Sequence, residues 1–244
     1  MALGVRWRAG LVLLATVVGV ASTARLAFWQ LDRAAQKIAI QAQIDARRAL
    51  APIDEAGLAH TAASAAVQHY RRASLHGRWL ADRTVFLDNR QMNGVPGFFV
   101  VTPLQLEGRP EAVAVQRGWV PRDFSDRTAL PILRTPAGIS TVDGLVLPPP
   151  SKLYEFSSAA SGPIRQNLDL EGYARETQRV LLPLSVLESD SASTAGDGLQ
   201  RQWPHPALDV SKNYGYAFQW FALCALMAGL YVWFQLLRPR RLKA

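Results

Sequence analysis

The chain has 244 residues, enough for one sizeable domain with anchors or for two small domains. Its formal net charge is +8, and six basic residues in the two ends account for most of this excess: Arg6, Arg8, Arg238, Arg240, Arg241 and Lys243. Charge placed in this way is a membrane-topology signal and not a nucleic-acid-binding surface, so no nucleic acid is expected as a partner. With Cys224 as the only cysteine, a disulfide, a thiolate metal site and a Cys-x-x-Cys redox pair are excluded.

The N-terminal segment consists of a short basic stretch, residues 1–8, and an uncharged stretch, residues 9–24. A basic start, an apolar middle and small residues at Ser22 and Ala24 are typical of a cleavable signal peptide. Alternatively, the Arg25 side chain reaches toward the lipid headgroups and the helix continues through Trp29 as a retained anchor. Both alternatives place the following segment outside the cytoplasm.

Residues 30–213 predict one extracytoplasmic α+β domain. Residues 30–50 predict a helix that leaves the membrane, and Pro52 predicts the start of a short second helix. The Asn93-Gly94 pair is a strong hairpin signal, and prolines 148–150 end a strand. The polar run 189–198 is expected to be a solvated loop. Strand-length runs lie at 68–79, 84–90, 98–106, 112–119, 139–147 and 180–187, with a short helix within 168–176. This pattern predicts an antiparallel β-meander and leaves open whether it closes into a small barrel.

The C-terminal apolar stretch, residues 214–237, holds no charged residue. At ~1.5 Å per residue it spans about 36 Å, enough to cross a bilayer core of ~30 Å. The alternative is the buried core helix of a soluble protein, but such a helix rarely runs so far without a charge. The predicted topology therefore has transmembrane helices at 9–29 and 214–237, cytoplasmic ends at 1–8 and 238–244, and the lipid bilayer as a partner.

The sequence contains no recognisable catalytic or metal-binding pattern. None of the four histidines has a helical partner three or four residues away, and no serine lies in a Gly-x-Ser-x-Gly elbow. We therefore expect neither an enzyme nor a metal site. The histidines are His60, His69, His76 and His205.

Two arginines at predicted strand ends, Arg90 and Arg117, are candidate ligand-binding residues. Guanidinium groups on nearby strands can hold carboxylates bidentately, including the propionates of a haem. The alternative is that each forms a structural ion pair with Asp88, Asp123 or Asp126.

Five stretches carry a resemblance to a known family: WQLDRAAQK, LDNRQMNGVPGFFVVTPL, VAVQRGWVPRD, GLQRQWPHP and NYGYAFQWF. In this order they resemble the surfeit-locus protein family of membrane assembly factors for haem-copper cytochrome oxidase. The resemblance implies a retained first helix and a non-enzymatic role in maturing cytochrome c oxidase subunit I. It also implies haem a as a transient cofactor, handled between haem a synthase and the oxidase. Since no transit peptide precedes the first helix, a bacterial inner membrane and a periplasmic central domain are expected.

One position departs from the family pattern. Bacterial members carry a histidine, the candidate haem ligand, where this chain has Asn213, and an amide is a poor iron ligand. Haem contact would then rest on the aromatic faces of Tyr216 and Trp220, with Arg90 and Arg117 as further candidates, or on a different histidine such as His205. The alternative hypothesis is a haem-free scaffold that docks oxidase subunits during assembly. A membrane-anchored enzyme or a copper chaperone would need a residue cluster that the sequence lacks.

Overall fold

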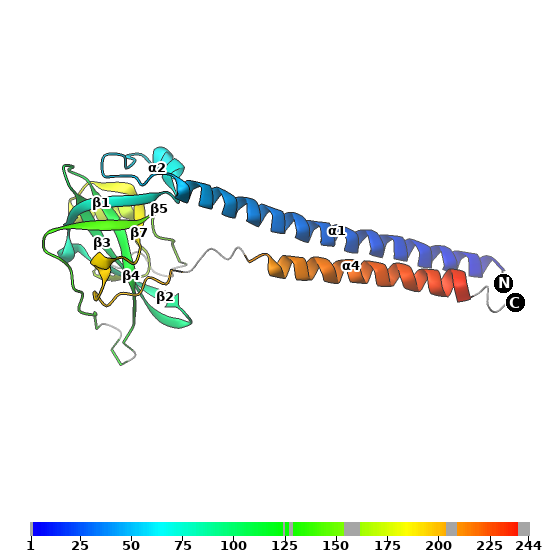
Figure 1. The fold of residues 1–244 in the computed structure, drawn as a ribbon. Helices are drawn as coiled ribbons and strands as arrows, with labels where there is room; N and C mark the ends of the chain where they lie inside the picture. The colour runs from blue at the N-terminus through cyan, green and yellow to red at the C-terminus, as the bar shows by residue number, and fades with distance from the viewer. Residues whose placement is uncertain (1, 124, 127–128, 154–161, 204–208, 239–244) are drawn as a thin grey trace. The chain divides into compact units, whose positions relative to one another are not determined.

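The computed structural model describes residues 2–123, 125–126, 129–153, 162–203 and 209–238. For residues 2–6 and 192 it describes the backbone only. The chain divides into two units, Met1–Gln43 with Pro206–Ala244, and Ile44–His205. The first unit is helical and the second contains a β-sheet (Figure 1).

The helical unit is built from two long helices. Helix α1 (Ala2–Ala49) joins the predicted first anchor and the predicted emerging helix into one uninterrupted element of 48 residues. Helix α4 (Ser211–Tyr231) continues into a π-helical segment, η3 (Val232–Leu237). No proline occurs within either helix, so nothing in the chain blocks the hydrogen-bond ladder. Both are long and apolar enough to cross a membrane, over Trp7–Ala49 and Ser211–Leu237.

Helices α1 and α4 run side by side in opposite directions (Figure 1). Their less exposed side chains follow one another at alternating spacings of three and four residues, which is the pattern of a coiled-coil seam. Ala27 and Ala34 on α1 are fully buried, and Ala217 on α4 is 3% exposed. Small residues let two helices approach closely in lipid. The seam residues are Thr16, Val20, Thr23, Ala27, Gln30, Ala34 and Lys37 on α1, and Asn213, Ala217, Trp220, Cys224, Met227 and Tyr231 on α4.

Direct contacts fix the register of this seam. The Cys224 thiol lies 3.7 Å from the Val20 carbonyl oxygen, and the rings of Phe28 and Phe221 meet edge to face at 5.4 Å between centroids. A Cβ added at Gly19 would lie 3.1 Å from the Met227 sulfur, so a larger side chain there would have to displace α4 or that methionine. The two helices therefore pair in one defined register.

The start of the second unit differs from the prediction. No helix opens at Pro52: Ile53 instead bridges to Ala73, accepting from the Ser74 amide and donating its own amide to the Arg72 carbonyl. Ile53 is 5% exposed, so burying this side chain against the sheet outweighs the local helix signal. The short helix lies later, at α2 (Ala62–Gln68), where Thr61 caps its first turn.

The sheet closes into a barrel. Strand order is β1-β5-β7-β4-β3-β2-β6, and a further pairing of β1 with β3 closes a five-stranded ring from which β2 and β6 extend. Most pairs are antiparallel, as predicted, but β4–β7 and β2–β6 are parallel, so the chain is not a simple meander. The strands are β1 (Arg72–Trp79), β2 (Val85–Met92), β3 (Val95–Leu106), β4 (Ala112–Pro121), β5 (Ile139–Leu147), β6 (Ile164–Arg165) and β7 (Leu181–Glu188).

Local signals in the strands are confirmed. Met92 pairs with Val95 across a two-residue loop in which Asn93 and Gly94 both have positive φ, 52° and 79°, as a type I′ hairpin requires. Strand β5 ends at Leu147, immediately before the three prolines. Helix α3 (Leu170–Thr177) occupies the predicted short helical stretch.

The barrel interior is filled with aliphatic side chains that alternate along the strands. Leu75, Val115, Leu184 and Val186 are fully buried within one cluster. Trp119 is 2% exposed and donates its indole N–H to the Arg90 carbonyl at 2.9 Å.

The polar run 189–198 is a largely exposed loop, as predicted, but it is anchored to the barrel. It contains a 3₁₀ turn, η2 (Ala192–Thr194), in which Thr194 is 7% exposed. Gln200, just after it, exchanges two backbone hydrogen bonds with Trp119 of β4. Hydrogen bonds within the run, and those of Gln200 to the barrel, hold this exposed loop in place.

Candidate functional site

Asn213 lies in a polar layer between α1 and α4. The side-chain oxygen of Asn213, Oδ1, accepts from Lys37 Nζ at 2.8 Å, and its side-chain nitrogen, Nδ2, donates to Gln30 Oε1 at 2.8 Å. Lys37 Nζ also donates to the Asp209 carbonyl oxygen at 3.1 Å. Both ends of the amide are therefore used to hold the two helices together.

The other two predicted residues of α4 lie differently. Trp220 follows Asn213 by two helical turns and is half-buried on the same seam, whereas Tyr216 is 53% exposed on another face. The structure therefore brings Asn213 and Trp220 onto one face and leaves Tyr216 apart.

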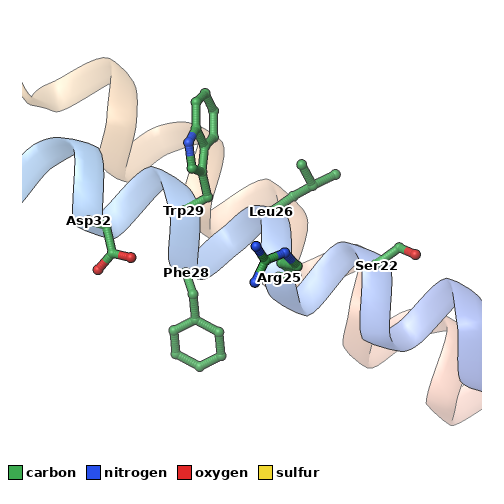
Figure 2. Close-up of a pocket in the computed structure, with 6 residues that line it drawn as sticks. All are labelled: Ser22, Arg25, Leu26, Phe28, Trp29 and Asp32. Carbon is green, nitrogen blue, oxygen red and sulfur yellow. The ribbon is translucent and has the colours of Figure 1, made fainter.

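A groove of about 810 Å³ follows the exposed side of α1 near the polar layer. Figure 2 shows its six lining side chains on this one helix, with Leu26 and Trp29 projecting to one side and Phe28 to another. Ser22, Arg25 and Asp32 supply the polar groups. A positive side chain beside aromatic rings suits the boundary between lipid and water.

Arg90 is a structural link within the second unit. Its guanidinium donates to the Ser151 carbonyl at 2.8 Å and the Gln166 carbonyl at 3.1 Å, and it lies over the Phe99 ring. Burial lowers the pKa of Arg90, but an arginine remains charged at neutral pH. Of its suggested carboxylate partners, Asp88 pairs with Arg122 instead.

Arg117 lies at a mouth of the barrel. It is 2% exposed, stacks on the Trp79 ring at 4.6 Å, and donates to Thr135 Oγ1 at 2.7 Å and the Arg134 carbonyl at 3.1 Å. Burial lowers its pKa, and the negative charges of Glu188 and Asp197 oppose that shift. Arg117 lines a cavity of about 830 Å³ whose lining does not include Arg90. The two arginines therefore do not form a single site.

A buried ion cluster beside Arg117 was not predicted. Arg201 donates to Glu188 at 2.9 Å and also bonds Asp197, and the side chains of Arg201 and Glu188 are 2% and 5% exposed. Burial by itself lowers the pKa of Arg201, but hydrogen bonds to Asp197 and the charge of Glu188 raise it overall. The four-residue spacing of Asp197 and Arg201 was the one available signal, and nothing in the local sequence indicates that this pair is buried.

The histidines form no metal site in the part of the chain that is described, where no three potential ligands come together. His60 contacts Glu111 at 3.1 Å and His76 contacts Glu55 at 2.8 Å, both in partly exposed pairs. His205 lies outside the described residues.

These features define a class: a small closed β-barrel linked to a pair of membrane-compatible helices that meet through a polar layer. Within that class, the chain belongs to the SURF1 family, whose model matches residues 17–225. The family is one of assembly factors associated with cytochrome oxidase and is not a known class of enzyme. No curated protein matches the chain.

Proposed function

We propose that the chain is a two-pass protein of the bacterial inner membrane that assists maturation of cytochrome c oxidase subunit I. Its periplasmic barrel domain would dock assembly partners, and it would act where haem a passes from haem a synthase to the oxidase. The observation that carries this proposal is the family match over residues 17–225, which include the barrel and parts of both helices.

The distribution of aromatic residues supports two membrane crossings. Trp7 and Trp29 are 22 residues apart on α1, and Tyr214 and Trp233 are 19 apart on α4 and η3. At ~1.5 Å per residue these intervals are about 33 Å and 28 Å, close to the ~30 Å core of a bilayer. All four side chains are exposed, as expected for rings at the two membrane interfaces.

The residues around position 213 do not fit axial ligation of haem iron. The Asn213 amide is occupied by Lys37 and Gln30, and the described histidines, His60, His69 and His76, all belong to the other unit. Any contact of haem with Trp220 or Tyr216 would be through ring faces. This geometry favours the second candidate function, a haem-free scaffold that docks oxidase subunits.

Deletion of the gene tests the assembly role. We expect oxidase activity and the haem a content of isolated subunit I to fall, and both to return on re-expression. Unchanged activity and haem content in the deletion strain would remove the proposal.

An Asn213→His variant separates the two candidates. Wild type and variant are purified from cells that also produce haem a synthase, and their absorption spectra are compared with that of Asn213→Gln. If wild type carries haem and the variant shows a sharpened Soret band, the haem-handling function is favoured. If none of the three carries haem while wild type still restores oxidase activity, the scaffold is favoured.

A further inference from the structure

The cavity that contains Arg117 is built at one mouth of the closed barrel. It is lined by the last residue of β1, the first residues of β5 and the last residue of β7, respectively Trp79, Ile139 to Thr141, and Glu188. Two further chain segments, 133–136 and 193–197, form the rest of its wall. The mouths of β-barrels are common places for small-molecule sites.

The acidic side chains of this cavity have a basic partner, whereas its arginines have no acidic partner in the part of the chain that is described. Glu188 and Asp197 are each already bonded to Arg201. Neither Arg117 nor Arg134 has an acidic group within ion-pair distance among the described residues. Two arginines, one buried and one exposed, thus line this cavity without a described acidic side chain in direct contact.

Arg117 is the more unusual of the two. A nearly fully buried guanidinium carries a large desolvation cost that needs an opposing charge or a full set of hydrogen bonds. Here the hydrogen-bond partners of Arg117 are two neutral oxygens, and its Nε has no partner. The Ser140 hydroxyl, in the same cavity, also lacks a partner. These are the properties of a site arranged for an additional acceptor.

We propose that this barrel mouth binds an amphipathic carboxylate. The carboxylate would lie against Arg117 and Arg134, because a planar guanidinium matches a carboxylate bidentately. Its apolar body would rest on Trp79, Leu133 and Ile139, which supply the apolar part of the lining. A monovalent carboxylate suits the site better than a dianionic phosphate, because Glu188 and Asp197 form part of the same wall. This proposal does not rest on a role in oxidase assembly.

The test uses the full chain in detergent micelles and a matched pair of probes, 2-naphthoate and uncharged 2-naphthalenemethanol. Binding is followed by saturation-transfer NMR, with empty micelles as the baseline for probe partitioning. We expect naphthoate to bind at least about tenfold more tightly than the alcohol. Equal affinity of the two probes would overturn the proposal.

Three variants locate the binding. Arg134→Gln changes an exposed side chain and is expected to weaken naphthoate binding about threefold to tenfold, as for a partly solvated ion pair. Arg117→Gln is expected to abolish the preference for the acid. Arg179→Gln, an exposed arginine outside this cavity, is the matched control and should change nothing. If Arg117→Gln does not fold, Arg134→Gln and the probe pair still decide; equal affinities for wild type and Arg134→Gln would contradict the proposal.

A competition experiment identifies the source of the carboxylate. Haemin carries two free propionates and haemin dimethyl ester carries none, while their apolar surfaces are nearly the same. Displacement of naphthoate by haemin but not by its ester would identify porphyrin propionates as ligands. Displacement by neither would identify a smaller carboxylate, and equal displacement by both would contradict recognition of the carboxylate.

Discussion

At the scale of single residues, Asn213 shows how the chemistry of a side chain sets the use of a position. An imidazole there would offer a nitrogen to a metal, whereas the amide offers an oxygen that accepts and a nitrogen that donates, and each atom has a partner across the helix pair. In an apolar environment, losing either bond would leave a polar group unpaired. Asn213 therefore acts as a link between helices in this chain.

Tyr173 gives a pH-dependent prediction at the same scale. It is 3% exposed, its hydroxyl donates to the Arg83 carbonyl, and burial raises its pKa to about 12. Because the folded state disfavours the phenolate, the stabilisation from Tyr173 is complete below the unfolded pKa of about 10 and is lost as the pH rises toward about 12.

The measurement is urea unfolding of wild type and Tyr173→Phe in the same micelles. From about pH 9 to about pH 11, we expect wild type to lose about 1 kcal/mol more of its unfolding free energy than the variant. Other tyrosines and lysines titrate in both proteins and cancel in the difference. Parallel pH curves for the two proteins would show that Tyr173 ionises equally easily in both states.

The roles of individual residues were only partly predictable. Asn93 and Gly94 follow local backbone rules, and the hairpin that they predict is present. Asp197 and Arg201 were missed, because the burial that gives their ion pair its importance depends on strands distant in sequence. Secondary-structure propensity depends on the neighbouring residues in the chain, whereas burial depends on residues that folding brings together from distant parts of it.

At the scale of elements, the helix pair combines an apolar exterior with a seam of small and polar residues. The apolar exterior was read directly from the sequence, but the seam was not, because Thr16, Thr23 and Gln30 are spread thinly among apolar residues. Their spacing becomes informative once a second helix is known to lie alongside. Similarly, Pro52 was assigned to a helix start because the pairing of Ile53 with Ala73 lies twenty residues away.

Cross-linking tests the register of α1 against α4. The Cys224 thiol lies near Val20, so Val20→Cys creates a pair of cysteines across the seam. We expect oxidation, or a short bis-methanethiosulfonate linker, to join them within one chain and shift its electrophoretic mobility. Ser22→Cys, exposed on α1, is the matched control and should not link within the chain. Equal cross-linking by both variants would contradict the register.

At the scale of the whole molecule, two apolar helices near the chain ends and a central β-barrel unit, residues 44–205, are consistent with the predicted α+β class. Barrel closure was left open because it depends on the β1–β3 pairing, in which Gly77 faces Leu106. A Cβ at Gly77 would collide with the backbone of Gln105, so a glycine permits this close approach. That requirement is visible in three dimensions and not in the pattern of hydrophobic residues.

Reporter fusions test the proposed topology of the whole chain. Ile132 is 97% exposed in the segment between β4 and β5, which makes this segment a suitable insertion point. We expect alkaline phosphatase inserted there to be active and green fluorescent protein to be dark, because the first needs the periplasm and the second fails to mature after Sec export. The same reporters fused after residue 238 should show the opposite result. Fluorescence from the central insertion would refute a periplasmic domain.

The position of the lone cysteine has a practical consequence. Cys224 belongs to α4, so the barrel keeps its shape through hydrogen bonds and packing and contains no covalent cross-link. Dithionite and thiol reductants therefore have no bridge to break in it. Ferrous and ferric spectra of any haem-loaded preparation can be compared on the same folded protein, and a change between them can be attributed to the iron.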